Sequence, residues 1–219
     1  AARAAAIGLS CRPPLPVRAV VLLDAVEGTA IEGFPRTAAW LKARPASFAT
    51  RKEAIAWALS SRMLQSPAAA SLSVPSRLRW NEAAKAWVWR TNIAGAAHFW
   101  SSWFEGLSAL FAGLAVPKLL VVGSFDCLDN ALEAAHMCGR FRLQVVPHDG
   151  HQVHEDRPAE VADALANFLG GVLRQRAAFA RLCTAGSLAG EAKRSRHVES
   201  RTAGAEASES KGKLSAPAA

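Results

Sequence analysis

The sequence predicts an α/β fold in which a mostly parallel sheet is flanked by helices. Two short runs of continuous, not alternating, apolar residues, Arg18–Asp24 and Pro117–Gly123, are typical of parallel strands that are covered on both faces. Leu143–Val146 is expected to form a third short buried strand. A polar loop follows each run, and open α/β sheets hold their reactive groups in loops beyond the carboxyl ends of the strands. A functional site is therefore expected in those loops.

Composition indicates one sizeable domain followed by a tail. Hydrophobic residues make up 51% of the 219 positions, and no apolar run approaches the roughly 20 residues of a membrane span. Of the net charge of +8, residues 172–219 carry +5, from nine Lys or Arg against four Glu. These residues contain few large apolar side chains, so we expect a disordered basic tail after a domain of residues 1–171. Such a tail is interpreted as a solvated segment, not as a nucleic-acid site.

The cysteines indicate the compartment in which the protein is expected, and the first residues indicate a fragment. Cys11, Cys127, Cys138 and Cys183 have no C-x-x-C spacing, so we expect reduced thiols, with neither a disulfide framework nor a metal site. This pattern is typical of an intracellular protein, cytoplasmic or nuclear, and no motif implies an organic cofactor. The chain begins with Ala1, not with Met, and no signal sequence follows, so we expect it to be a fragment.

Between the first two predicted strands, residues of about 31–112 are expected to form a lid region. Thr50 followed by Glu53 is a capping-box pattern, which predicts a helix from there to about Leu59. Large apolar residues at helical spacing predict a single helix over Ala96–Phe111. The other expected elements are a loop that begins at Glu27–Ala30, a helix at Arg36–Lys42, a hairpin of Leu78–Trp80 with Trp87–Trp89, a helix at Ala131–Met137, and a helix from Pro158 that Gly170 and Gly171 end.

The loop after the third strand holds three of the six histidines, His148, His151 and His154, and a histidine there is a candidate general base. Asp24 and Asp126 follow the first and second strands, and either carboxylate could orient the base. This order of strands, acids and histidine is that of the second half of an α/β-hydrolase sheet. In that fold a serine on a G-x-S-x-G turn precedes the acid and the histidine. The 219 residues contain no G-x-S-x-G turn.

Several longer segments are more distinctive than this general order. They are Leu23–Ala30, Arg44–Phe48, Glu53–Trp57, Trp89–Arg90, Trp100–Phe111, Pro117–Leu120, Met137–Phe141 and Gly150–Asp156. Through them, residues of about 17–170 resemble the C-terminal part of the protein phosphatase methylesterase family. Members of that family are serine esterases that remove the methyl ester from the C-terminal leucine of the protein phosphatase 2A catalytic subunit.

The resemblance implies roles for three residues of this chain. Asp24 takes the place of the family's triad acid, His151 that of its base, and Met137 that of a residue that contacts the phosphatase. The implied partner is the protein phosphatase 2A catalytic subunit, and no metal or cofactor is implied. The family's nucleophilic serine lies in a G-H-S-M-G-G turn, which by spacing would fall just upstream of Ala1. We therefore expect this fragment to be inactive alone.

Other residues have a plainer interpretation, and two other functions stay open. Asp126 is expected to cap the helix that follows it, and Glu27 to hold the loop behind Asp24. His148 and His154 are expected on a solvated surface. The alternatives to a phosphatase methylesterase are a generic esterase or lipase of the same fold, and a non-catalytic module that binds the phosphatase.

Overall fold

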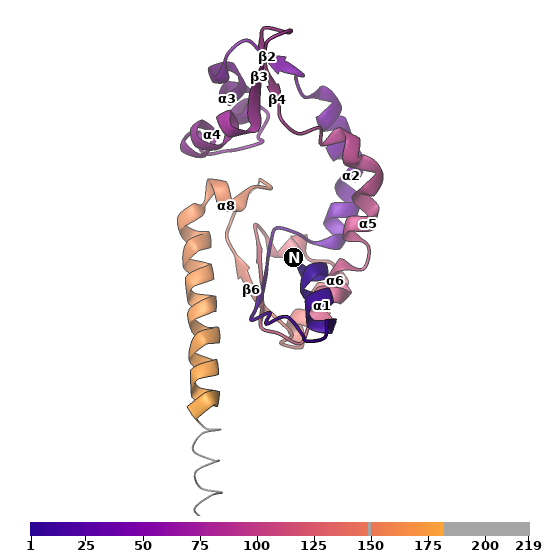
Figure 1. Ribbon diagram of the computed structural model, residues 1–219, viewed down its shortest axis with the longest axis vertical. Coiled ribbons are helices and arrows are strands. Elements are labelled where there is room, and N and C mark those ends of the chain that lie inside the picture. The colour runs from indigo at the N-terminus through magenta and orange to yellow at the C-terminus, as the bar shows by residue number, and fades with distance from the viewer. Residues whose placement is uncertain (149, 182–219) are drawn as a thin grey trace, which may run out of the picture. The chain divides into compact units, whose positions relative to one another are not determined.

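The computed structural model describes residues 1–148 and 150–181 of the chain (Figure 1). The chain divides into two compact units, residues 1–169 and residues 170–219. The first unit holds Asp24, Met137 and His151, the residues nominated for function. Most of the predicted tail, from residue 182 onward, lies outside the described residues. Among those that are described, no helix has the length and apolarity needed to cross a bilayer.

In the described part of the chain, the main sheet has three parallel strands, and it confirms the predicted α/β architecture. β1 (Val20–Leu23), β5 (Lys118–Val122) and β6 (Arg142–Val145) lie in the order β1-β5-β6. Leu22 lies beside Leu120, and Leu120 beside Leu143, so the apolar runs are aligned across the sheet. Every residue of the central strand β5 is buried. Because the strands are parallel, the loops that follow them emerge at one edge of the sheet.

Helices packed on this sheet complete the main core. α1 (Ala2–Ser10), α6 (Leu107–Gly113) and α7 (Asn130–Met137) all contribute buried residues to it. Phe111 of α6 is fully buried and packs against Phe141, with 5.4 Å between the ring centroids. Aromatic side chains bury large apolar areas and dominate the energetics of such cores. This core fixes the strands whose ends carry the site.

Residues 44–92 form a second small module, which we call the cap (Figure 1). A second, antiparallel sheet in the order β2-β4-β3 packs with helices around its own apolar cluster, which includes Phe48, Leu64 and Leu78. The elements of the cap are β2 (Ser47–Phe48), α3 (Arg51–Ser60), α4 (Pro67–Ser73), the 3-10 helix η1 (Val74–Arg77), β3 (Leu78–Asn81) and β4 (Ala86–Trp89). The predicted hairpin is confirmed, because β3 and β4 pair antiparallel.

The capping box at the start of α3 is also confirmed. The Thr50 hydroxyl accepts a hydrogen bond from the backbone N–H of Glu53, at 3.1 Å. In return, the Glu53 carboxylate accepts one from the backbone N–H of Ala49, at 2.9 Å. Thr50 thus pairs one of the donors that the helix start would otherwise leave free, and Glu53 reaches back to the residue before the N-cap.

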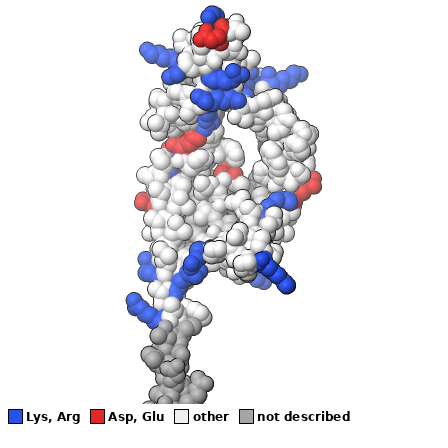
Figure 2. Space-filling view, viewed as in Figure 1, with Lys and Arg blue, Asp and Glu red and all other residues white. Residues whose placement is uncertain are grey.

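The cap carries a large share of the positive charge. Residues 44–92 hold eight Lys or Arg and two Glu, a net charge of +6, and Figure 2 shows these basic groups gathered over the cap. With +5 on residues 172–219 and +8 in total, the rest of the chain is net negative. The excess of basic residues is therefore not confined to the tail.

The helix that leads from the sheet to the cap is longer than the sequence predicts. α2 (Glu27–Ala43) begins at Glu27, not near Arg36, so the loop predicted there is wrong. Pro35 inside the helix lowers its intrinsic propensity. Phe34 nevertheless packs against the ring of Trp100, with 5.6 Å between the centroids. Tertiary contact of this kind overrides local propensity.

The single helix predicted over residues 96–111 is wrong as well. The segment is divided into the 3-10 helix η2 (Ala94–Phe99), α5 (Trp100–Phe104) and α6. Gly106 separates α5 from α6 with a φ of +74°, in the left-handed region that glycine adopts without strain. A glycine within an apolar helical pattern is only a weak signal of such a break.

The helix that follows the histidine loop runs past its predicted end. Residues 158–181 are helical, through Gly170 and Gly171, where the sequence predicted a stop. A glycine inside a helix costs about 1 kcal/mol relative to alanine, which is not enough to end a helix by itself. Leu, Arg and Ala residues, which favour helices, follow the two glycines.

Candidate active site

Asp24 is the first residue after β1, and its backbone bends there. Its φ of +49° lies in the left-handed region, which Asp tolerates better than most side chains. Its backbone N–H still donates to the carbonyl of Val121 in β5, at 2.8 Å. The bend therefore occurs at the carboxyl edge of the sheet, and it leaves the Asp24 side chain 17% exposed.

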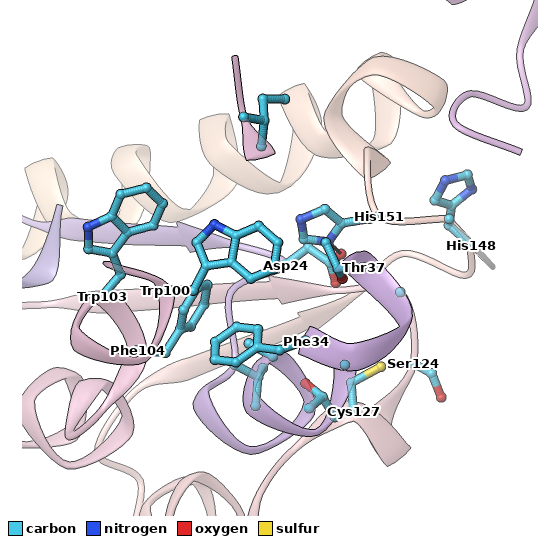
Figure 3. Close-up of a pocket in the computed structure, with 17 residues that line it drawn as sticks. Asp24, Phe34, Thr37, Trp100, Trp103, Phe104, Ser124, Cys127, His148 and His151 are labelled. Carbon is cyan, nitrogen blue, oxygen red and sulfur yellow. Dashed lines mark hydrogen bonds and ion pairs between the residues drawn. The ribbon is translucent and has the colours of Figure 1, made fainter. Parts of the chain in front are cut away.

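His151 lies in the loop after β6 and meets Asp24 at that edge (Figure 3). Its Nδ1 is 2.7 Å from Oδ2 of Asp24, a hydrogen-bond distance. The hydrogen bond to Asp24 raises the pKa of His151, burial opposes the rise, and the charge of Asp24 adds to it. The hydrogen bond is the largest of these three effects on the pKa. A carboxylate at Nδ1 favours the tautomer that leaves Nε2 as the free acceptor.

A pocket of about 730 Å³ opens beside this pair. Its polar end includes Asp24 and His151, and its apolar wall is formed by Phe34, Trp100, Trp103 and Phe104 (Figure 3). Its volume is typical of small-ligand sites, which measure about 300–1,000 Å³. Phe34 belongs to α2 and the other three aromatic residues to α5. The two helices that the sequence mispredicted therefore shape the pocket.

Ser124 and Cys127 line the same pocket after β5. The Ser124 hydroxyl accepts a hydrogen bond from the backbone N–H of Asp126, at 3.3 Å, and in Figure 3 it points away from His151. Cys127 is a free thiol of intermediate exposure. Neither side chain is placed as a nucleophile for His151, so the described residues bring together an acid and a base beside an apolar pocket.

Asp126, the other acid that the sequence allowed, lies apart from the histidine. It is exposed on the 3-10 helix η3 (Phe125–Cys127). The expectation that Asp126 caps the next helix is wrong, because the cap of α7 is Asp129, whose Oδ1 accepts from the N–H of Leu132 at 2.9 Å. Asp129 stands directly before the helical pattern, a local signal that could have identified it.

Glu27 and Asp129 hold together the chain segments behind Asp24. The two carboxylate oxygens of Glu27 accept from the backbone N–H groups of Gly106 and Ser108, at 2.8 and 3.0 Å. Oδ2 of Asp129 accepts from the Ser108 hydroxyl at 2.6 Å and from the N–H of Gly28 at 3.2 Å. The start of α2, just after Asp24, is thereby tied to the left-handed turn before α6 and to the start of α7.

The two other histidines of the loop differ from each other. His154 is 49% exposed, as expected. The expectation that His148 is solvated is wrong, because only 1% of its side chain is exposed. Its Nε2 lies 3.1 Å from Oδ2 of Asp156, whose side chain is 3% exposed, although the angles do not fit a hydrogen bond. The loop folds back under the cap, because Oδ1 of Asp156 accepts from backbone N–H groups of the cap.

Met137 is the last residue of α7, and 85% of it is exposed. A partner could therefore reach it, and its role in binding stays a prediction. Across residues 1–148 and 150–181, no group of three or more His, Cys, Asp or Glu side chains has an arrangement that could hold a metal ion.

The sequence profile of the alpha/beta hydrolase family matches residues 1–164. The chain belongs to the alpha/beta hydrolase family. Among solved structures of this fold, a crystal structure of E-2-(acetamidomethylene)succinate hydrolase aligns with a TM-score of 0.58 and 20% identity, over 72% of this chain and 59% of that one. A marine microorganism esterase aligns with a TM-score of 0.51 and 18% identity, over 76% and 66%. At these identities, the likeness shows the fold alone.

More similar relatives of this alpha/beta hydrolase are named protein phosphatase methylesterase 1, which confirms the resemblance found in the sequence. That of Aspergillus fumigatus is 39% identical over 156 residues, which cover 69% of this chain and 37% of the relative. That of Schizosaccharomyces pombe is 38% identical over 151 residues, which cover 68% and 43%. The chain thus spans about two fifths of the length of these relatives.

Proposed function

We propose that this chain supplies the acid and the base of a serine carboxylesterase of the protein phosphatase methylesterase type. The observation that carries the proposal is the 2.7 Å contact between Nδ1 of His151 and Oδ2 of Asp24, beside a pocket. In this role, Asp24 holds the imidazole and stabilises its charged form, while Nε2 of His151 accepts the proton of the nucleophile.

The reaction proceeds through an acyl-enzyme. A serine hydroxyl attacks the ester carbonyl and passes its proton to His151, which returns it to the departing methoxide, so that methanol leaves. Water then gives a proton to His151 and attacks the acyl-serine. Collapse of this second intermediate returns that proton to the serine and leaves a free carboxylate.

The serine itself would come from outside the given sequence. The 219 residues contain no G-x-S-x-G turn, and Ser124 points away from His151 (Figure 3). The similar methylesterases are more than twice as long as the segments that match. We therefore assign the nucleophile to a segment that precedes Ala1 in the complete protein, and expect the 219-residue chain alone to be inactive.

The substrate proposed is the methyl ester of the C-terminal leucine of the protein phosphatase 2A catalytic subunit. The names of the similar relatives support this class of substrate. The aromatic wall of the pocket suits an aliphatic side chain such as that of leucine (Figure 3). Met137, exposed at the end of α7, is then a candidate contact with the phosphatase.

The test uses the complete protein and the methylated phosphatase catalytic subunit. We expect release of methanol, and we expect His151→Ala to lower kcat by about 10⁴-fold or more, as loss of a triad base does. A small aromatic acetate ester serves as a second substrate. Equal kcat/KM on both substrates would instead favour a generic esterase, and tight binding of the phosphatase with no hydrolysis would favour a non-catalytic module.

A further inference from the structure

A partly buried polar cluster joins the cap to the loop that carries His151. On the cap side it consists of the backbone N–H groups of Gln65 and Ser66 and the side chain of Arg77. On the loop side it consists of the side chains of His148, Gln152, Glu155 and Asp156. We call this cluster the clamp. Its members stand on both sides of His151 in the sequence.

Asp156 is the residue of the clamp that contacts both sides. Its Oδ1 accepts from the backbone N–H groups of Gln65 and Ser66, at 2.9 and 2.8 Å. Its Oδ2 lies 3.1 Å from Nε2 of His148. The side chains of Asp156 and His148 are 3% and 1% exposed and gain almost nothing from water, so the buried carboxylate is stabilised mainly by its hydrogen bonds to the two cap N–H groups.

Arg77 adds a second attachment just after His151. Its Nη2 donates to Oε1 of Gln152, at 2.6 Å, and forms an ion pair with Glu155. Before His151, the first residue after β6 is Val146, whose N–H donates to the carbonyl of Val122 in β5 at 2.9 Å. The loop is therefore held to the sheet on one side and to the cap on the other.

His151 itself has little packing to fix its position. Its side chain is 84% exposed, and the hydrogen bond to Asp24 is the polar contact that the structure gives it. Reaction geometry tolerates only small displacements, since a shift of 1 Å can cost about 100-fold in rate. The position of the imidazole must therefore be set mainly by the backbone on either side of it.

We propose that Asp156 is a positioning residue for His151. Its single carboxylate accepts hydrogen bonds from the cap through Oδ1 and lies against His148 through Oδ2, and so holds the loop where the imidazole meets Asp24. The contact of the loop with the cap is thereby coupled to the hydrogen bond between His151 and Asp24. The catalytic consequence rests on the proposed esterase function, whereas the effect on the His151–Asp24 contact does not.

The test follows two readouts in the complete protein. Histidine NMR reports the hydrogen-bonded Nδ1 proton of His151 and the titration of its ring, and hydrolysis of the methyl ester gives kcat and KM. In Asp156→Ala we expect loss of that proton signal, a fall in the pKa of His151 and a kcat about 10- to 100-fold lower, with KM little changed. A folded Asp156→Ala protein with wild-type histidine spectra and kcat overturns the proposal.

Asp156→Asn tests whether the effect comes from the contacts of the clamp or from a general loss of stability. The amide oxygen can keep the place of Oδ1 and accept the two cap N–H groups, while the charge opposite His148 is lost. We expect smaller changes in the same direction as in Asp156→Ala, and wild-type spectra and kcat here also count against the proposal. This variant decides the matter if Asp156→Ala does not fold.

Glu160→Gln is the matched control, because it removes a carboxylate four residues away that pairs with Arg157 at 3.7 Å on the exposed surface. It should leave spectra and kinetics unchanged, and an effect as large as that of Asp156→Ala would contradict the proposal. If the wild-type protein hydrolyses no ester, the proposed function fails. The NMR readout still tests the clamp in that case.

Discussion

Gly123 offers a sharp test of how tightly the histidine loop is fitted to the sheet. It follows β5 directly, and a Cβ built there would lie well under 3.0 Å from the carbonyl oxygen of His148. Real Cβ atoms essentially never approach so closely, so in Gly123→Ala the loop must retreat by roughly half an ångström. The oxygen belongs to the backbone and the position of a Cβ is fixed by the backbone, so rotation of a side chain cannot relieve the contact.

A displacement of this size is comparable with the tolerance of a catalytic site, which is about 0.5 Å. We expect Gly123→Ala to lower kcat in the ester hydrolysis proposed for the complete protein by about 10- to 100-fold, and to lower its free energy of unfolding by about 1–3 kcal/mol. Ester hydrolysis and urea unfolding measure the two effects. Wild-type values of both would refute the reasoning.

The matched control for this substitution is Gly113→Ala, at the end of α6. A Cβ there meets no atom within 4 Å, and the backbone is not in the left-handed region. Since alanine is a better helix former than glycine, the variant should be as active as wild type and more stable by up to about 1 kcal/mol. A comparable loss of activity in Gly113→Ala would show that the effect at Gly123 is not specific to the loop.

Two further predictions concern the acid–base pair and the core. Asp24→Asn should lower the pKa of His151, because it removes the hydrogen bond to a carboxylate and the charge that raise it; an unchanged histidine NMR titration would contradict this. The stability that Asp24 gives through His151 is fully present below the ordinary pKa of 6.5 and is lost as pH rises through the folded value, so urea midpoints should depend less on pH in Asp24→Asn. Phe111→Ala should cost about 3–5 kcal/mol in unfolding free energy, because the ring is fully buried. Phe99→Ala, at a ring that is 51% exposed, should cost much less in the same measurement.

The parts of the fold that the sequence predicted are those with local causes. The apolar runs of β1 and β5, the hairpin and the capping box at Thr50 all depend on residues a few positions apart. The break at Gly106 depends in part on Glu27, 79 positions away, whose carboxylate binds the N–H of that glycine. No window of sequence contains both partners, so periodicity alone extended one helix through the break.

In the site, too, features with local causes could be predicted and those that depend on distant residues could not. Parallel strands bring their carboxyl ends to one edge, so the topology made contact between Asp24 and His151 plausible although they are 127 positions apart. The sequence pattern left Asp126 as an equal candidate, because both acids follow strands. The burial of His148 could not be predicted, since His148 lies beside Asp156, whose carboxylate in turn binds cap residues about 90 positions earlier in the chain.

The two outer strands of the described sheet are of different kinds. β6 mixes polar and apolar residues, Arg-Leu-Gln-Val, as strands at the rim of a sheet often do to discourage further pairing. β1 reads Val-Val-Leu-Leu, the composition of a strand with neighbours on both sides, yet in the described residues it pairs with β5 alone. No strand of the described residues covers its other side.

An exposed apolar strand edge of this kind is a template for pairing with other strands. At high concentration, copies of the 219-residue chain should associate through β1, because an apolar edge pairs with any extended chain that reaches it. A synthetic peptide that pairs with β1 would act as a donor strand and would cover this edge. The solution behaviour of the 219-residue chain should therefore depend on this edge of β1, which is four residues long.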